Sequence, residues 1–317
     1  MGTTLVTGAN GQIGSELVET LRQRHGVDSV VGFDLHPAPN ERGLHITGDV
    51  RDARALRTLI ESHDIDTVYH LASLLSATGE QHPNQAWDVN MNGLKHILDL
   101  ARTHGFSLFW PSSIAVFGPS TPRVDTPQET VLNPTTMYGV TKRSGELLCR
   151  YYHQRYGVDV RSLRYPGLIS YKTEPGGGTT DYAIDMYHAA ANGTPYTCYL
   201  RADTRLPMMY MPDAIRATLN LMDAPPNALT VRDSYNITAF SFSANELATH
   251  LNERTSNGFS VTYVPDERQD IADNWPASVD DSTARTDWNW QPEYDLAAMT
   301  NDMLTHLTPS NTEPQHA

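Results

Sequence analysis

Cysteine is scarce in this chain, which holds only Cys149 and Cys198 among 317 residues. Two cysteines are too few for a disulfide framework or a thiolate zinc site, so we expect a reduced, cytoplasmic protein. Positive charge is also in short supply, because 23 basic and 37 acidic side chains give a formal net charge of −14. A surface of this sign repels phosphate backbones and anionic lipid, which argues against nucleic-acid and membrane partners.

Long apolar runs and metal-ligand motifs are missing as well. No run approaches the roughly 18 apolar residues that span a bilayer. The first residues show no charged region followed by an apolar stretch, so no leader peptide is expected. The 13 histidines include no pair at His-x-x-x-His spacing beside a carboxylate motif, and we therefore expect no catalytic metal.

Short apolar runs alternate with longer helical patterns over the first 170 residues. We expect strands at residues 3–8, 29–34, 44–50, 67–73, 108–113 and 158–166. We expect helices near residues 12–25, 52–63, 85–104 and 137–156. Strands rich in Val, Ile and Leu that alternate with helices predict an α/β fold, with a doubly wound parallel sheet covered on both faces.

The pattern changes after Pro166. Glycines at 176–178 indicate a loop, and a helix at 181–192, a strand at 207–211 and a helix at 212–223 follow. We therefore expect a Rossmann-like domain at residues 1–170, to which 207–240 returns. Residues 171–206 and 241–310 would form a smaller α/β lobe over the carboxyl edge of the sheet, where open α/β folds bind ligands. A flexible tail is expected at 311–317.

A glycine-rich turn joins the first expected strand to the first expected helix, in Thr7-Gly8-Ala9-Asn10-Gly11-Gln12-Ile13-Gly14. Such a turn lets the backbone approach a pyrophosphate, whose charge then meets the helix N-terminus. No Lys-Ser or Lys-Thr follows the glycines, which excludes a nucleoside-triphosphate loop. The contacts would come from Gly8, Gly11, Gln12, Ile13 and Gly14.

The ends of the next strands carry further candidate contacts. Asp34 ends the second strand, where a carboxylate binds both adenosine ribose hydroxyls and repels a 2′-phosphate, which favours NAD over NADP. Asp49 could accept a hydrogen bond from the adenine amino group while Val50 covers the ring. At each of the positions after Asp34, the alternative is that the residue ends its strand and contacts no ligand. The remaining candidate cofactor contacts are Leu35, Leu71, Ala72, Ser73 and Asn90.

Tyr138 and Lys142 lie four residues apart in Tyr-Gly-Val-Thr-Lys, which places them on one face of the expected helix. A free phenol has a pKa near ~10 and is a poor base at neutral pH. An adjacent ammonium and a positively charged nicotinamide ring would both favour the phenolate, and we expect a depressed pKa. Ser112 and Ser113, at the end of the fifth expected strand, offer hydroxyls that could orient an alcohol oxygen.

Together these segments resemble the extended short-chain dehydrogenase/reductase family, over about residues 1–300. The Ser-x-x-x-Phe-Gly segment is similar to the family's Ser-x-x-x-Tyr-Gly, which assigns the catalytic hydroxyl to Ser113 rather than Ser112. Longer strings at 163–171, 176–183 and 203–214 resemble the short-chain type of L-threonine 3-dehydrogenase. The resemblance implies that Tyr165, Pro166 and Leu168 line a nicotinamide pocket.

The activity that the resemblance implies is NAD-dependent oxidation of the L-threonine β-hydroxyl to 2-amino-3-oxobutanoate, with Tyr138 as base. The expected substrate contacts are Ser76, Ser113, Tyr138, Thr179, Thr180, Asp181 and Trp275. The family commonly pairs the helix at 137–156 across a two-fold axis, and its Leu147, Leu148, Tyr151 and Tyr152 predict a homodimer.

Two other functions remain open. A nucleotide-sugar epimerase or dehydratase of the same family would need basic residues in the smaller lobe to hold a diphosphate, and 171–206 contains only Lys172, Arg201 and Arg205. A non-catalytic NAD sensor often lacks the phenol or the lysine, and this chain has both.

Overall fold

A parallel sheet of six strands forms the centre of the larger domain, in the order β3-β2-β1-β4-β5-β7. The structure is a computed structural model that describes residues 2–38, 43–173, 176–255 and 257–308; the expected tail at 311–317 lies outside them. The strands are β1 (Thr3–Thr7), β2 (Val30–Asp34), β3 (His45–Thr47), β4 (Ile65–His70), β5 (Ser107–Phe109) and β7 (Val160–Arg161). This confirms the predicted Rossmann-like α/β fold.

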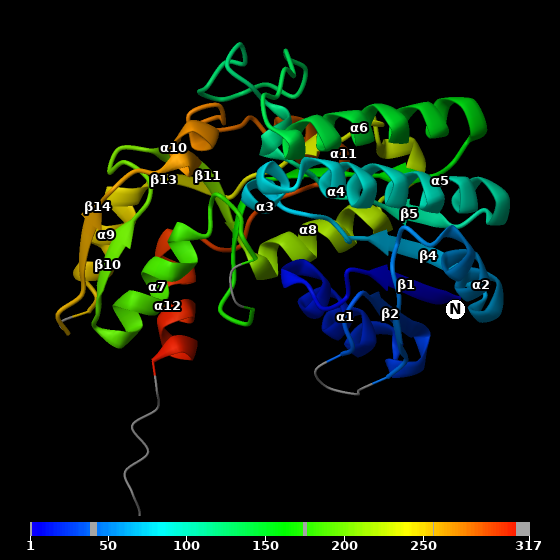
Figure 1. Cartoon of the computed structure of the whole chain (residues 1–317), viewed down its shortest axis with the longest axis horizontal. Coiled ribbons are helices and arrows are strands. Elements are labelled where there is room, and N and C mark those ends of the chain that lie inside the picture. Colours follow the sequence, from blue (N-terminus) through cyan, green and yellow to red (C-terminus); the bar gives the residue numbers. More distant parts are fainter. Residues whose placement is uncertain (1, 39–42, 174–175, 256, 309–317) are drawn as a thin grey trace, which may run out of the picture.

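Helices cover both faces of this sheet, as Figure 1 shows. Neighbouring residues of β1 face opposite cores: Leu5 packs with the helices α2, α5 and α6, and Val6 packs with α1 and α8. Both side chains are fully buried, which explains why two consecutive residues of this strand are apolar. The helices are α1 (Gln12–His25), α2 (Ala53–His63), α5 (Gly93–His104), α6 (Met137–Tyr156) and α8 (Met211–Asp223).

The helix expected at 85–104 is longer and less regular than predicted. It begins as α4 (Pro83–Trp87), continues as a π-helical turn at Asp88–Asn92, and becomes α5. A further helix, α3 (Ser76–Gln81), precedes it and was not predicted. The π turn includes Asn90, whose side-chain amide binds the loop after β4 rather than its own helix.

Two of the expected strands are divided. The run expected at 108–113 ends its pairing in the central sheet at Phe109, and β6 (Ser112–Ser113) joins a different sheet after Pro111. The run expected at 158–166 gives β7 and β8 (Leu163–Tyr165), which are separated at Ser162, and β9 (Gly167–Ile169) follows Pro166. Proline has no N–H for a strand ladder, so the chain changes partners after Pro111 and after Pro166.

The strands beyond these breaks form two small sheets of three strands each, β12-β8-β6 and β13-β11-β9. Their other members are β11 (Arg205–Tyr210), β12 (Tyr235–Asn236) and β13 (Phe240–Ser243). The small sheets therefore carry the chain from the central sheet toward the second lobe, and they place Ser113 and Tyr165 side by side in register.

The smaller lobe lies beside the carboxyl edge of the central sheet (Figure 1). Its elements are α7 (Tyr182–Asn192), β10 (Pro195–Cys198), α9 (Ala244–Asn252), β14 (Ser260–Tyr263), α10 (Glu267–Ala272) and α12 (Leu296–Leu307). The short helices are η1 (Val27–Ser29), η3 (Ile114–Val116), η4 (Pro226–Ala228) and α11 (Ser282–Trp288). In the described part of the chain, every helix is too short or too polar to cross a membrane.

Candidate active site

Helix α6 supplies the two candidate catalytic side chains. Its N-cap, Thr136, accepts a hydrogen bond from the Gly139 N–H at 3.0 Å, which fixes where the helix begins. Tyr138 and Lys142 follow on one face, with only 9% and 2% of their surfaces exposed. The Lys142 ammonium lies 5.4 Å from the centroid of the Tyr138 ring and 4.8 Å from that of Trp110.

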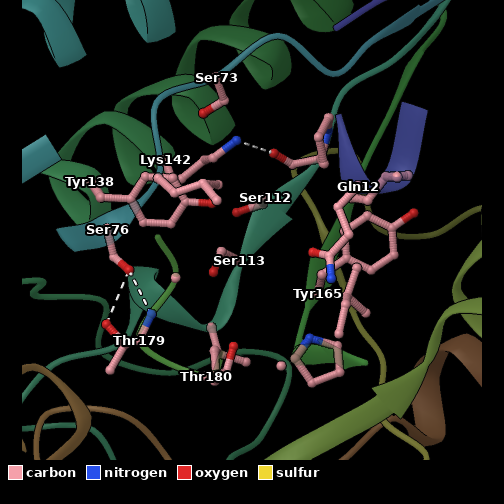
Figure 2. Close-up of a pocket in the computed structure, with 18 of the residues that line it drawn as sticks. Gln12, Ser73, Ser76, Ser112, Ser113, Tyr138, Lys142, Tyr165, Thr179 and Thr180 are labelled. Atoms are coloured by element: carbon pink, nitrogen blue, oxygen red, sulfur yellow. Dashed lines mark hydrogen bonds between the residues drawn. The ribbon is translucent and has the colours of Figure 1, made fainter. Parts of the chain in front are cut away.

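The strand end at β6 faces this pair of residues. The Lys142 ammonium donates to the Pro111 carbonyl oxygen at 2.7 Å. The Ser113 hydroxyl lines the same cavity as the Tyr138 phenol, whose pKa it lowers, and it accepts the Ala115 N–H at 3.2 Å. Figure 2 shows the phenol, the ammonium and the two neighbouring serines around one space. The fold thus brings the predicted catalytic groups together.

Burial favours the neutral form of both groups. It raises the pKa of Tyr138 to about 12, and the Ser113 hydrogen bond lowers that pKa only in part. It also lowers the pKa of Lys142 to about 7. The sequence predicted a depressed phenol pKa, from the ammonium and a nicotinamide charge together. In the chain by itself the shift has the opposite sign, because burial is the largest cause.

A cavity of about 740 Å³, counting space open to solvent, surrounds these groups. The predicted residues on its walls are Gln12, Ile13, Leu71, Ser73, Ser76, Ser112, Ser113, Tyr138, Lys142, Tyr165, Pro166, Leu168, Thr179, Thr180, Asp181 and Trp275. Residues from the glycine turn, the central strands and the smaller lobe therefore share one space. The predicted nicotinamide and substrate contacts meet there.

The hydroxyls of Thr179 and Thr180, the Asp181 carboxylate and the Trp275 indole line the cavity opposite Ser76 of α3. The Ser76 hydroxyl accepts the Thr179 N–H at 3.2 Å and lies 3.1 Å from the Thr179 hydroxyl (Figure 2). The Asp181 carboxylate accepts the N–H groups of Gly177 and Gly178 at 2.9 and 2.7 Å. Burial raises the pKa of Asp181, and these two backbone bonds oppose that rise. Among the described residues on the walls, Lys142 is the one basic side chain.

A second cavity, of about 790 Å³, opens beside the first and shares Leu71 and Ser73 with it. Its predicted lining residues are Gly8, Gly11, Asp34, Leu35, Asp49, Val50, Leu71, Ala72 and Ser73. Gly8 has a φ of +70°, and a Cβ there would lie 2.7 Å from the Ala72 nitrogen. Only glycine allows this close approach between the turn and β4.

Asp34 is held at the end of β2 by two backbone donors. Its carboxylate accepts the Asn10 N–H at 3.0 Å and the His36 N–H at 3.1 Å. The Asn10 side chain in turn donates to the carbonyl oxygens of His36 and Pro37. These bonds join the glycine turn to the loop after β2, and the second cavity lies against both.

Asp49 has a partner that the sequence did not reveal. The Arg51 guanidinium binds both of its carboxylate oxygens, and these hydrogen bonds hold the Asp49 pKa below its usual value. Arg51 also lines the second cavity, beside Val50. Asp49, the predicted acceptor for the adenine amino group, is therefore already hydrogen-bonded to Arg51. Arg51 lines the cavity too and is a further candidate contact for a ligand there.

Two predicted cofactor residues, Gly14 and Asn90, lie behind the cavity walls. A Cβ on Gly14 would lie 2.0 Å from the Gly8 carbonyl oxygen, so this glycine lets α1 pack against the turn. The Asn90 amide donates to the Leu74 carbonyl and the Thr141 hydroxyl, both at 3.1 Å, and accepts the Leu74 N–H at 2.8 Å. Both residues shape the site without facing it.

Several residues on the cavity walls were not predicted from the sequence. They are Leu75, Pro111, Ile114, Gly167 and Gly178 in the first cavity, and Phe33, His36, Gly48, Arg51, Leu74, Gln85 and Val89 in the second. Most flank predicted residues in the chain, so position after a strand end was the available signal. Gln85 and Val89 lie on the irregular helix, whose direction the sequence pattern does not give.

The described residues fit a dinucleotide. Gln12 begins α1, and its side-chain nitrogen is buried without a hydrogen-bond partner beside the first cavity. A pyrophosphate oxygen would accept from this donor and from the free N–H groups of the helix N-terminus. The two adjoining cavities match the two halves of such a ligand.

No cluster of three or more His, Cys, Asp or Glu side chains suited to a metal ion occurs within the described ranges. His70 lies at the end of β4, where the charge of Lys142 acts on it. Its Nδ1 lies 2.7 Å from the Thr7 hydroxyl, and burial lowers its pKa to about 3, so it is neutral. It therefore supports the strand end rather than adding charge.

The chain is similar to known proteins over nearly its whole length. The model of the NAD dependent epimerase/dehydratase family matches residues 4–238. An uncharacterized epimerase/dehydratase of Staphylococcus haemolyticus is 47% identical, over 96% of this chain and 97% of that protein. The holo structure of a GalE-like L-threonine dehydrogenase from Cupriavidus necator is 53% identical, with a TM-score of 0.94 over 96% of this chain and 99% of that one. A monomeric L-threonine 3-dehydrogenase from a metagenome is 48% identical, with a TM-score of 0.94 over the same shares.

The assigned packing role of Gly14 in the glycine turn can be tested by thermal melting. Gly14→Ala would press a Cβ against the Gly8 carbonyl, and we expect it to destabilise the fold by roughly 1–3 kcal/mol. Gly11→Ala is the matched control, because its Cβ meets only that carbonyl, at 3.3 Å. Thermal melting should show a lower midpoint for Gly14→Ala and a nearly native one for Gly11→Ala. Equal midpoints would contradict the assigned role of Gly14.

Proposed function

The chain belongs to the NAD-dependent epimerase/dehydratase family, and we propose that it oxidises L-threonine at the β-hydroxyl to 2-amino-3-oxobutanoate, with NAD as cofactor. The observation that carries the proposal is the first cavity, in which the phenol of Tyr138 faces the hydroxyls and carboxylate of 179–181. Sequence identity above 45% to solved structures of L-threonine dehydrogenases supports the same reaction.

When bound, NAD⁺ supplies the hydride acceptor and a positive ring charge beside the phenol. Gly8, Gly11 and Gln12 would hold its pyrophosphate, and Asp34 its adenosine ribose. Asp34 would also repel a 2′-phosphate, which favours NAD over NADP. Lys142 would reach the nicotinamide ribose. The nicotinamide end would lie against the walls formed by Tyr165, Pro166 and Leu168.

Three side chains perform the proton transfer. Tyr138, as the phenolate, accepts the proton of the substrate hydroxyl. Ser113 hydrogen-bonds the same oxygen and orients it toward the phenol. Lys142 stabilises the phenolate through its positive charge, and its own bond to Pro111 keeps the ammonium in place. The chain thus supplies orientation and electrostatics for the alcohol oxidation.

The remaining walls suit the two charged ends of an amino acid. The Asp181 carboxylate would bind the substrate ammonium, with its orientation set by Gly177 and Gly178. Hydroxyls of Ser76, Thr179 and Thr180 would hold the substrate carboxylate as neutral donors. The buried Trp275 would cover the pocket from the smaller lobe. These assignments leave space for a small polar substrate.

An epimerase or dehydratase of nucleotide sugars is the rival function within the family, and the smaller lobe favours threonine. Its three basic residues at 171–206 pair with carboxylates: Lys172 with Glu19, Arg201 with Asp273 and Arg205 with Glu246. None of the three is among the described residues of the cavity walls. A diphosphate entering the cavity would therefore find no free cation from this segment.

The threonine proposal predicts a simple assay. The purified protein should form NADH from NAD⁺ and L-threonine, followed by absorbance at 340 nm, and should not turn over UDP-sugars. Tyr138→Phe removes the general base, so we expect kcat to fall at least about a hundredfold while NAD still binds. Near-normal turnover by this variant would exclude the role of Tyr138, and UDP-sugar turnover by the wild type would favour the rival function.

The pH dependence of this reaction follows from the Tyr138 pKa. Burial raises that pKa to about 12, and a base acts only when deprotonated, so kcat should rise as the pH rises. The Ser113 hydrogen bond lowers the same pKa. Ser113→Ala should therefore move the acid limb of the pH–rate profile to higher pH. A profile that stays in place would show that Ser113 does not act on the phenol.

We also propose a homodimer formed through α6. Val140, Leu147 and Tyr151 lie on one face of this helix and are 37%, 42% and 51% exposed. The sequence grouped Leu148 and Tyr152 with them, but Leu148 packs against the core of the larger domain and Tyr152 is 5% exposed. The outward face is therefore narrower than predicted.

Sedimentation of the native protein tests the dimer. We expect about twice the chain mass of 35.2 kDa, and Leu147→Glu should shift the population toward one chain by placing a charge in the interface. Val124→Glu is the control, since Val124 is 68% exposed and lies outside α6. A native mass of one chain at micromolar concentration would contradict the proposal.

We infer a cytoplasmic location as well. Its support is the pair of free, buried thiols, Cys149 and Cys198, which a reducing compartment leaves unpaired.

A further inference from the structure

Helix α6 holds the strand end at 111–113 through two hydrogen bonds. The Lys142 ammonium donates to the Pro111 carbonyl oxygen, and the Ser112 hydroxyl donates to Glu146 at 2.7 Å. The next residue along the strand, Ser113, faces the same cavity as Tyr138, which lies one helical turn before Lys142. Neither of the proposed reacting groups, Tyr138 and Ser113, takes part in the bond between Ser112 and Glu146.

Glu146 is an acidic residue with no exposed surface. The guanidinium of Arg164 donates to its two carboxylate oxygens at 2.8 and 3.1 Å, and Arg143 donates to one of them at 3.0 Å. A buried carboxylate is stable only when its oxygens are paired and hydrogen-bonded in this way. Glu146 is therefore fixed by two cations before the Ser112 hydroxyl is counted.

Arg164 is fixed in its turn. It is 2% exposed, lies on β8, and pairs in register with Ser112 on β6. Its remaining guanidinium nitrogen donates to the Gln128 carbonyl and the Asn236 side chain, both at 3.1 Å. Burial disfavours its charge, but Glu146 outweighs burial and raises the Arg164 pKa. The guanidinium thus stays charged and links β8, β12 and the loop at Gln128 to α6.

We propose that Ser112 and Glu146 are positioning residues, whose hydrogen bond holds the Ser113 hydroxyl in place against the Tyr138 phenol. The inference rests on the proposed function, because it assigns a role in that reaction. It differs from a role for Ser112 in substrate contact: Ser112 acts here only through Ser113, its neighbour in the chain. A displacement near 1 Å at a reacting group can cost about a hundredfold in rate, so one buried bond can matter to catalysis.

Ser112→Ala is the variant of choice. It removes one hydroxyl and leaves Glu146 with its arginine donors, so the buried charge stays paired and the protein folds. Glu146→Ala would instead leave Arg164 buried without its partner, which is strongly destabilising. Ser162→Ala is the matched control. Ser162 is also 2% exposed, and its hydroxyl makes one side-chain hydrogen bond, to Ser234 at 2.9 Å, outside the cavity.

The two variants should have similarly lowered melting temperatures and unlike kinetics. We expect Ser112→Ala to reduce kcat for threonine by roughly tenfold to a hundredfold. Its KM for threonine and its Kd for NAD⁺ should stay near the wild-type values. The acid limb of its pH–rate profile should move to higher pH, because a displaced Ser113 hydroxyl would no longer lower the Tyr138 pKa. Ser162→Ala should keep the wild-type kcat and pH profile.

A double-mutant cycle tests whether Ser112 works through Ser113. With Ser113→Ala already present, adding Ser112→Ala should change kcat little, since the group it positions is gone. Additive losses, or a raised KM in place of a lowered kcat, would overturn the proposal, and so would a Ser112→Ala variant that matches Ser162→Ala in kcat. Absence of NADH formation from threonine by the wild-type protein would refute the proposed function instead.

Discussion

Burial of a phenol and an ammonium in one cavity is the constraint on which the chemistry of this protein depends. Tyr138 and Lys142 lie in an environment that favours the uncharged form of each, so the phenol pKa rises and the ammonium pKa falls. In the proposed reaction, the positive charge of a bound NAD⁺ ring would favour the phenolate against this effect of burial. The residues around the cavity hold the phenol and the ammonium in fixed positions.

The fold provides that apparatus at the point where the chain leaves the central sheet. Pairing in the central sheet ends at Phe109, just before Pro111, and at Arg161, and the strands that follow join the small sheets that lead toward the second lobe. The glycine turn after β1 lies against Leu71 and Ala72, which follow β4. The candidate catalytic, cofactor and substrate residues thus meet where strands change partners, next to the helix that carries Tyr138.

Local patterns predicted much of this arrangement. The glycine spacing, the position of Asp34 after its strand, and the i, i+4 spacing of Tyr138 and Lys142 are properties of short segments, and a sequence displays them directly. The parallel, doubly wound sheet was predicted from the alternation of strands and helices, and the structure confirms it. Thr179 and Thr180 were found through family resemblance rather than through any physical signal in the segment.

What the sequence could not give depends on contacts between distant segments. Glu146 reads as one more polar residue on a helix, and only the fold shows that it meets Arg164 with no access to water. The Asn90 amide faces a loop because a π turn redirects its helix. The sign of the Tyr138 pKa shift was missed for the same reason, since burial is a property of the whole packed structure.

The wall shared by the two cavities, Leu71 and Ser73, has a consequence for how the protein uses its cofactor. In the proposed binding mode, adenosine and nicotinamide would contact nearly separate sets of side chains. Binding energy from the unreactive adenosine end could then hold the nicotinamide end in an orientation that is unfavourable by itself. A nucleotide fragment that fills only the adenosine chamber would occupy the protein and leave its phenol untouched.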